Sequence, residues 1–404
     1  MTSMREATRT IDRATDSDAM GTISSPTFRL GRRPALDGMR ALAVLAVFAG
    51  HAELPLAGGG HLGVDVFFVL SGFLITALLV EEHRETGTTS LRAFIARRAR
   101  RLLPAFLVFA AATALIVGPN VTADQRRALF GGLLASLAYV RNWVQITRHT
   151  GLEGFTQPHL WSLAVEEQFY LVWPLVFLVL SRIRGARNLL VPFAGLFAAS
   201  TALGLFLSNS KADRVSLGTD VRAVQMLAGA IVAVLLTSGL AMRLPTTLGP
   251  LPLDLLLGLA IVGVVLLDSV LKDRFIREFY LRGGIALFGT LVAAFLLMLL
   301  RTPDSAVNRA LAIRPLVFVG AMSYSVYLWH ALVITLVTPS SVVKLGLFHV
   351  QNSAARVVAM LVGTLGIAAL STFTVERWCQ RHFFQWADRR HAKPSGLPVV
   401  STHP

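Results

Sequence analysis

Apolar residues occur along this chain in long runs that short polar segments separate. The runs cover residues 37–54, 62–82, 102–118, 127–145, 161–181, 188–207, 222–240, 250–271, 283–300, 316–337 and 354–376. Each run is close to the roughly 20 residues that an α-helix needs to cross a bilayer. The pattern therefore predicts an all-α, polytopic membrane protein. Its membrane domain is expected over residues 34–384, between disordered polar tails at residues 1–33 and 385–404.

Basic residues indicate which of these runs cross the membrane, because short cytoplasmic linkers are enriched in lysine and arginine. Arginines precede the first run and are concentrated in the linkers at 92–101 and 182–187. These two linkers lie on the same side of the membrane only if one of the apolar segments between them does not cross it. Residues 127–145 form the shortest and most interrupted run, so we expect them to be re-entrant or interfacial. Ten crossings then place both termini in the cytoplasm, and only the basic linker at 272–282 violates the rule.

Composition supports a multi-pass protein of the plasma membrane. Hydrophobic residues make up 54% of the chain and charged residues 15%, whereas a typical soluble domain has about 25% charged residues. A single soluble domain is thereby excluded. The net charge is +15, but the basic residues lie between apolar runs, where they meet anionic lipids or phosphates and not nucleic acid. The single cysteine, Cys379, excludes an intrachain disulfide, and no metal site is expected.

Two ionisable residues lie in the first apolar run, where a charged side chain is costly and marks a functional candidate. Arg40 and His51 are eleven residues apart, which places them about 20° from the same helical face and about 16 Å apart along the axis. One helical stripe therefore carries a cation at one end and an imidazole near the other. The structural alternative is that Arg40 extends to the lipid headgroups and that His51 only ends the span.

Polar residues also interrupt the second run and the basic linker after it. Asp65 lies at the start of the second run, and Ser71 and Gly72 lie in its middle. These two small residues form either a packing notch for a neighbouring helix or a space for a substrate chain. Arg98 and Arg101 are three residues apart and share a helical face. They bind anionic lipid or, in the more specific interpretation, the pyrophosphate of a nucleotide carrier.

Carboxylates, tyrosines and a histidine occur in two later runs. Ser162, Glu166 and Tyr170 recur at i, i+4 and i+8 and therefore line one helical face. Glu166 is the better candidate for the bundle interior, since a carboxylate facing lipid is costly. Tyr324 and His330 lie in SYSVYLWH, where an aromatic belt explains the tyrosine but not the histidine.

Seven motifs in a fixed order resemble the acyltransferase 3 family of membrane O-acyltransferases. They are LDGMRALAVLAV, GVDVFFVLSGFLI, FIARRARRLLPA, HLWSLAVEEQFYL, TDVRAVQMLAGA, SYSVYLWH and VERW, over residues 35–380. The resemblance implies a ten-span bundle that moves an acyl group, often acetyl, from acyl-CoA to a hydroxyl of a surface glycan, glycolipid or macrolide-like acceptor. Many relatives carry a C-terminal esterase-like domain, and this chain is expected to lack one.

The resemblance also assigns roles to individual residues. Its basic residue and histidine correspond to Arg40 and His51, its arginine pair to Arg98 and Arg101, and its serine-glycine-phenylalanine motif to Ser71, Gly72 and Phe73. We accordingly expect catalytic roles for His51, Arg40, Glu166, Asp65 and Ser71, and contacts to the acyl donor from Arg98, Arg101, Gly72, Phe73, Tyr324 and His330. Acyl-CoA is expected as a co-substrate, with no tightly bound cofactor. A homo-oligomer is compatible with the sequence.

The expected chemistry needs a base that takes the proton of the acceptor hydroxyl. His51 suits this role, because the ordinary pKa of histidine lies near neutrality. A carboxylate such as Glu166 or Asp65 would orient its imidazole, as in hydrolase triads. Direct transfer and an acyl-enzyme on Ser71 or His51 are both open. The rival hypothesis is a transporter or flippase that uses the same residues as an ion path, against which the lack of an internal repeat counts.

Overall fold

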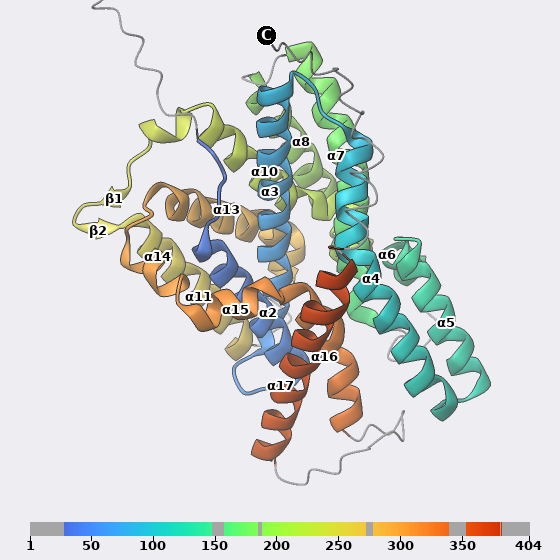
Figure 1. The fold of residues 1–404 in the computed structure, drawn as a ribbon. Coiled ribbons are helices and arrows are strands. Elements are labelled where there is room, and N and C mark those ends of the chain that lie inside the picture. Colours follow the sequence, from blue (N-terminus) through green and yellow to red (C-terminus); the bar gives the residue numbers. More distant parts are fainter. Residues whose placement is uncertain are drawn as a thin grey trace, which may run out of the picture.

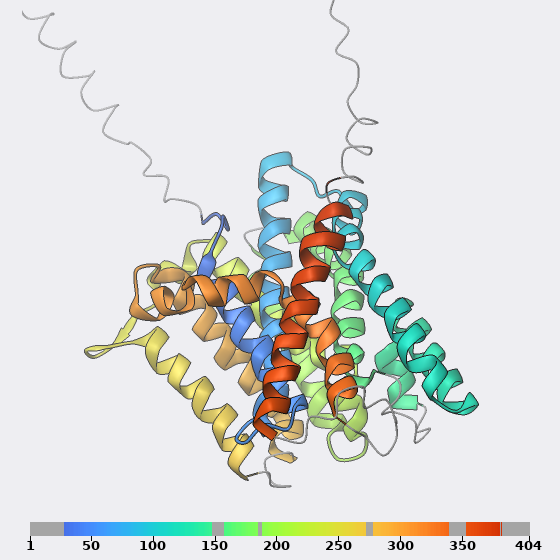
Figure 2. The same cartoon turned by 60° about the horizontal axis from the view of Figure 1, so that its bottom comes forward.

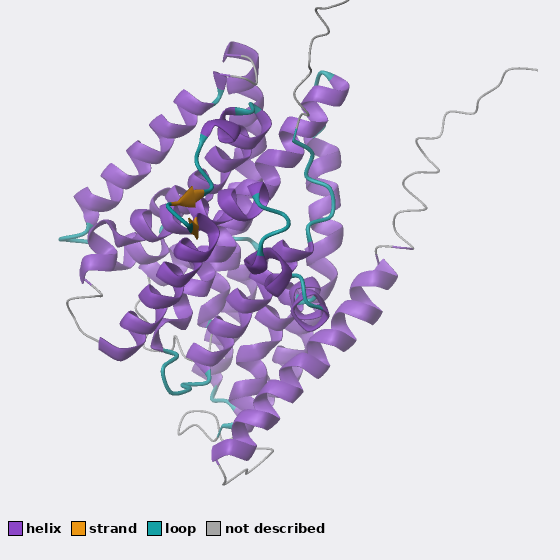
Figure 3. Ribbon diagram, turned by 90° about the vertical axis from the view of Figure 1, so that its left-hand side faces the viewer, coloured by secondary structure: helices purple, strands orange, loops and turns teal. Residues whose placement is uncertain are grey.

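The computed structural model of the chain describes residues 28–147, 157–184, 188–271, 278–338, 353–379 and 381. Helices dominate the described residues (Figures 1, 2 and 3). The longer helices are α2 (Pro34–His51), α3 (Leu62–Thr86), α4 (Leu91–Val117), α5 (Ala123–Leu137), α7 (Trp161–Arg184), α8 (Leu190–Leu207), α10 (Thr219–Thr237), α11 (Leu253–Leu271), α13 (Ile285–Arg301), α16 (Ser323–Val337) and α17 (Ser353–Leu370). This confirms the predicted all-α fold.

Short elements connect the long helices. They are α6 (Arg141–Thr147), α9 (Ala212–Leu217), α14 (Ala306–Leu311), α15 (Arg314–Ala321), η1 (Gly58–His61), η2 (Gly118–Asn120), η4 (Pro158–Leu160), η6 (Leu240–Arg243), η7 (Tyr280–Gly284) and η8 (Ser371–Glu376). Within the described ranges, the strands are β1 (Thr247–Leu248) and β2 (Leu251–Pro252), which form one antiparallel hairpin. This hairpin is exposed and leads into α11.

Eight helices in the described part of the chain are long and apolar enough to cross a bilayer. A ninth crossing results if α15 and α16, which are bent by 74° at a short break, form one span. The 18-residue helix α2 is not among the eight, and its polar residues Asp37, Arg40 and His51 lower its hydropathy. The described part of the chain therefore offers eight or nine candidate spans, and the ten crossings that the sequence predicts require α2 to cross as well.

The segment expected to be re-entrant or interfacial forms two short helices. α5 has 15 residues, and α6 has seven. A 15-residue helix is only about 22 Å long, which is less than the roughly 30 Å of the hydrocarbon core. Between the two helices Tyr139 has a φ of 57°, a left-handed conformation that no helix continues through. Residues 127–145 therefore do not form a single straight span.

Close backbone packing joins α3 to α10 at the centre of the bundle. A Cβ atom added at Gly72 would overlap with the carbonyl oxygen of Met226, and one added at Gly229 would overlap with that of Val69. Small residues at helix interfaces allow this approach. Of the two interpretations of Gly72, the structure therefore supports the packing notch.

Candidate active site

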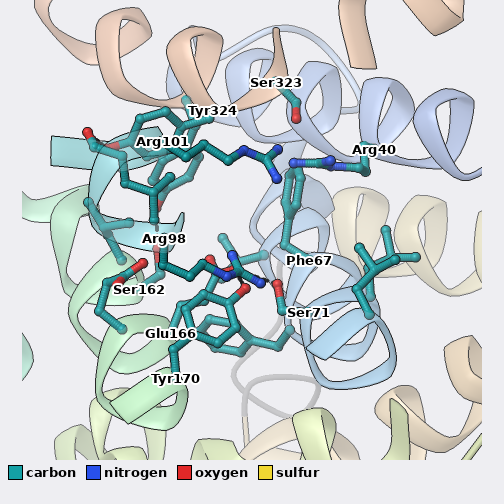
Figure 4. Close-up of a pocket in the computed structure, with 18 residues that line it drawn as sticks. Arg40, Phe67, Ser71, Arg98, Arg101, Ser162, Glu166, Tyr170, Ser323 and Tyr324 are labelled. Carbon is teal, nitrogen blue, oxygen red and sulfur yellow. Dashed lines mark hydrogen bonds between the residues drawn. The ribbon is translucent and has the colours of Figure 1, made fainter. Parts of the chain in front are cut away.

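Five helices enclose a cavity of about 80 Å³ in the bundle (Figure 4). α2, α3, α4, α7 and α16 each contribute to its wall. Several residues that the sequence singles out meet there, namely Arg40, Ser71, Arg98, Arg101, Ser162, Glu166, Tyr170 and Tyr324. The bend between α15 and α16 helps to form this wall, because the cavity-lining residues of α16 lie in its first turn and a half. Side chains from widely separated parts of the sequence therefore form one site.

Glu166 is held by two hydroxyl groups at the base of this cavity. Ser71 from α3 and Tyr170 from α7 both donate hydrogen bonds to its Oε1 atom. Tyr170 lies one helical turn after Glu166, which is the spacing that brings i and i+4 side chains together. Ser162, one turn before Glu166, lines the same cavity. The predicted polar face of α7 is therefore confirmed.

Arg98 lies flat against the ring of Tyr170. Its Cζ atom is 3.6 Å from the ring centroid, well within the distance at which a cation and an aromatic face attract each other. The tyrosine thus connects the arginine to the carboxylate of Glu166, since its hydroxyl binds that carboxylate. This arrangement fixes the guanidinium group at the cavity wall.

Arg40 and Arg101 extend into the cavity from opposite sides. Their guanidinium groups point toward each other in Figure 4, although both are positively charged. Within the described residues, neither of these groups nor that of Arg98 forms an ion pair with a carboxylate. The glutamates that line the cavity are Glu166 and Glu167, fewer than the three arginines. Three guanidinium groups that outnumber the lining carboxylates make the cavity suited to an anion.

His51 does not line this cavity, because it is the last residue of α2, three helical turns after Arg40. It belongs to a cluster of three histidines. Its ring centroid is 4.9 Å from that of His330 and 6.4 Å from that of His159, and the latter two are also 4.9 Å apart. His51 is exposed, whereas His159 and His330 are buried. The structure thus places His330 with His51 and not with the arginines of the expected donor site.

Backbone hydrogen bonds fix the tautomers of two of these histidines. Nδ1 of His51 is 2.9 Å from the carbonyl oxygen of Val47, and Nδ1 of His330 is 2.6 Å from that of Tyr327. A carbonyl oxygen can only accept, so the neutral imidazole carries its proton on Nδ1 in both residues. Nε2 of each ring then holds a lone pair and can act as a base.

Tyr327 and Ser162 lie between the cavity and the histidine cluster. Both line the cavity, and the Tyr327 hydroxyl donates to the carbonyl oxygen of His159 at 2.6 Å. The hydroxyl groups of Ser162 and Tyr327 are 2.5 Å apart. The Tyr327 ring also contacts the rings of His159 and His330, with centroids 5.5 Å away in each case. The two halves of the site are therefore adjacent, with a hydrogen-bonded pair of side chains between them.

Three residues expected in the site lie elsewhere. Asp65 is buried in an ion pair with Arg222, at 2.9 Å, and accepts a hydrogen bond from Tyr280, so it does not orient His51. Gly72 packs on α10. Phe73 is fully buried in the core. None of the three lines the cavity.

Sequence reasoning missed His159 and Tyr327 as site residues. His159 precedes the tryptophan of HLWSLAVEEQFYL, and Tyr327 lies three residues before His330. Both belong to motifs that carried the family resemblance, and this was the signal that could have identified them.

Comparison with known proteins matches most of the chain to one family. Residues 33–373 match a family described as an acyltransferase domain, acyltransferase 3. A peptidoglycan O-acetyltransferase of Listeria monocytogenes is 33% identical over 89% of this chain and 58% of its own length. A putative peptidoglycan O-acetyltransferase of Bacillus subtilis is 34% identical over 88% of this chain and 56% of its own. A putative O-acetyltransferase of Staphylococcus aureus is 34% identical over 75% of this chain and 51% of its own length.

The chain thus spans little more than half the length of these curated relatives. No solved structure matches it.

Proposed function

Because the chain belongs to the acyltransferase 3 family of membrane acyltransferases, we propose that it transfers an acetyl group from acetyl-CoA to a hydroxyl of a cell-wall glycan. One observation carries the proposal. A cavity lined by three arginines that form no ion pair with a carboxylate among the described residues lies beside the first half of α2, and a base with a fixed tautomer lies at the last residue of α2.

The arginine cavity is proposed to bind the anionic end of the donor. Acetyl-CoA carries its phosphates far from its thioester, and arginine binds phosphate oxygens through paired, charge-assisted hydrogen bonds. Arg98 and Arg101 are one turn apart on α4, and Arg40 faces them from α2. Bound phosphate would also relieve the repulsion between the facing guanidinium groups of Arg40 and Arg101, since opposite charges attract strongly where water is scarce.

The dimensions of α2 fit a long donor. Eleven residues separate Arg40 from His51, or about 16 Å along the helix. A donor with its phosphates at the arginines can therefore extend its thioester toward the imidazole. Ser162 and Tyr327 line the cavity on the side of the histidines, so donor binding is proposed to open the cavity past these two side chains.

The histidine end is proposed to receive the acceptor. His51 is exposed, so a large glycan can reach it without entering the bundle. Two of the relatives are named as peptidoglycan O-acetyltransferases, one of them putatively, which favours a hydroxyl of peptidoglycan as the acceptor. In the proposed topology the arginine end is cytoplasmic and His51 faces outward. Cytoplasmic acetyl-CoA would then acetylate an exported glycan.

The proposed reaction is a direct transfer. Nε2 of His51 takes the proton from the acceptor hydroxyl. The oxygen of that hydroxyl then attacks the thioester carbon. The new C–O bond forms, the C–S bond breaks, and the CoA thiolate takes up the proton. Ser71 is less suited to carry the acetyl group, because its hydroxyl is bonded to Glu166 within the cavity and lies away from the histidines.

Acetylation of cell walls tests the proposal. The chain is expressed in a bacterium that lacks its own peptidoglycan O-acetyltransferase, and acetate released by mild alkali is measured from purified peptidoglycan. We expect ester-linked acetate with the native chain, and a loss of at least tenfold in the His51→Ala variant at equal protein level, since general bases typically contribute about 10²–10⁴-fold. Equal acetate in cells with the native chain and with an empty vector would refute acetyl transfer to peptidoglycan.

A further inference from the structure

Ser323 is a polar residue of the cavity wall that the proposed reaction does not use. It is the first residue of α16, and it is 1% exposed. Its hydroxyl oxygen is buried and has no hydrogen-bond partner among the described residues. A buried polar group without a partner is unfavourable and calls for an explanation, because it has given up its hydrogen bonds to water. A ligand that accepts a hydrogen bond in the cavity would supply the partner.

The hydroxyl of Ser323 is directed toward the guanidinium groups of Arg40 and Arg101 (Figure 4). The two arginines reach this gap from α2 and α4, and the serine reaches it from α16. A guanidinium group only donates hydrogen bonds, and a hydroxyl can donate one as well. Three side chains on three helices therefore present donors to one gap, and the group that fits between them is an acceptor with a negative charge.

The N-terminus of α16 adds to the positive character of this gap. α15 and α16 are bent by 74° at a short break, so α16 begins as a separate helix at the cavity, and its first residues line the wall. No side chain among the described residues caps this end of the 15-residue helix. The N-terminus of a helix carries a partial positive charge and favours an anion. The unpartnered hydroxyl and the helix end therefore indicate the same kind of ligand.

A hydrogen bond outside the gap holds α16 beside Arg101. The hydroxyl of Tyr324, the residue after Ser323, donates to the carbonyl oxygen of Leu102 at 3.0 Å. Leu102 follows Arg101 in α4, so this bond joins the first turn of α16 to the turn of α4 that carries the arginine. The serine and the arginine are thus placed by the fold itself.

We propose that Arg40, Arg101 and Ser323 form a phosphate subsite. The Ser323 hydroxyl donates to one oxygen of a phosphoryl group, and the two guanidinium groups bind its other oxygens. A phosphoryl group offers acceptor oxygens in several directions, as donors from three helices require, whereas a carboxylate offers two oxygens in one plane. Arg98, which is stacked on Tyr170, is left to contact a neighbouring phosphoryl group. The inference rests on the proposed function for the identity of the donor, and it makes Ser323 a residue that selects a phosphorylated donor.

Ser323→Ala tests the hydroxyl directly. It removes a buried group that has no partner, so the Tm of the ligand-free protein should not fall, whereas loss of a structural hydroxyl would lower it. The Kd for inorganic pyrophosphate, measured by calorimetry on the purified protein in detergent, should rise about tenfold, because a hydrogen bond to a charged group contributes a factor of at least this size. The Kd for acetyl-CoA should rise by a similar factor.

Thr335→Val is the matched control on the same helix. The hydroxyl of Thr335 donates to the carbonyl oxygen of Ala331 at 2.8 Å, and the residue does not line the cavity. This variant loses a hydroxyl from α16 without touching the subsite. Its Kd values for pyrophosphate and acetyl-CoA should stay within about twofold of the native values.

A second pair of variants tests the charge of the gap. Ser323→Asp and Ser323→Asn introduce side chains of nearly equal size that both suit a helix N-terminus, but only the aspartate places a negative charge before the two guanidinium groups. The ligand-free Tm should therefore be higher for Ser323→Asp than for Ser323→Asn. Pyrophosphate should bind more weakly to Ser323→Asp, because the carboxylate repels it and occupies its position.

The outcomes separate the subsite from the proposed function. Equal Kd values for pyrophosphate in the native chain and Ser323→Ala would overturn the subsite, as would the absence of pyrophosphate binding to the native chain. A lower ligand-free Tm in Ser323→Ala, or a lower Tm in Ser323→Asp than in Ser323→Asn, would also count against it. If acetyl-CoA binds equally well to the native chain and to Ser323→Ala, the proposed function stands and the subsite fails. If pyrophosphate binding depends on Ser323 but acetyl-CoA does not bind, the subsite stands and the proposed donor is wrong.

Discussion

The buried pair of Asp65 and Arg222 allows a sharp test of whether an expected catalytic residue is structural. The two side chains lie in α3 and α10 and are 1% and 5% exposed. Arg222 also donates to the hydroxyl of Tyr280 at 2.7 Å and to the carbonyl oxygen of Ser216 at 2.6 Å, and it lies over the ring of Trp161. The network therefore joins four separate segments of the chain.

Removal of one partner leaves the other charge buried without compensation. Such a change typically costs about 3–5 kcal/mol, whereas replacement of both partners by apolar residues of similar volume is often neutral. The Tm of a 404-residue chain shifts by only about 1.2 °C per kcal/mol, because the entropy of unfolding grows with chain length, so Asp65→Leu alone should lower the Tm by about 4–6 °C. Asp65→Leu combined with Arg222→Met should restore most of this loss.

The measurements are thermal stability of the purified protein in detergent and acetyl transfer by the same preparation at low temperature. If Asp65 only holds the fold, the double variant should recover transfer together with Tm. Arg127→Met serves as the control, since its ion pair with Asp124 is largely exposed and should matter little. A double variant with native Tm but without transfer would refute the structural role and return Asp65 to the catalytic residues.

Two further predictions concern the arginine end and the topology. Arg98→Lys keeps the charge but loses the planar contact with the ring of Tyr170. The Kd for acetyl-CoA, measured by calorimetry, should therefore rise about tenfold. Arg92→Lys, at an exposed position, is the control and should not change this Kd. After the native cysteine is changed to serine, cysteines at Ser90 and Asn188 should resist an impermeant thiol reagent and one at Pro55 should react. Opposite labelling of positions 90 and 188 would refute ten crossings.

Features within one helix could be predicted from the sequence, because the helical repeat fixes them. The shared face of Ser162, Glu166 and Tyr170 is one example, and all three line the cavity. The 11-residue spacing of Arg40 and His51 is another, since it places two kinds of chemistry at opposite ends of α2. The long apolar runs likewise predicted the spans, because their length and hydropathy depend on no tertiary contact.

Partners on different helices could not be predicted in the same way. Asp65 is 157 residues from Arg222, and no spacing rule connects them. The sequence offered Asp65 as a partner for His51 on chemistry alone, whereas packing of α3 against α10 decided the pairing. For the same reason, the sequence could not predict that His159 lies near the other histidines. His159 is in a 3₁₀ turn before α7 and approaches those histidines only through helix packing.

The division of the site between two ends of one helix has a consequence for transfer between compartments. Arg40 and His51 both lie on α2, so their separation of about 16 Å is fixed by a rigid element and not by a flexible loop. In the proposed function, a donor held at the arginines would therefore present its thioester at a constant depth. The hydrogen-bonded Ser162 and Tyr327 lie on the path between them. In the proposed function, these two side chains would have to move for the thioester to reach His51.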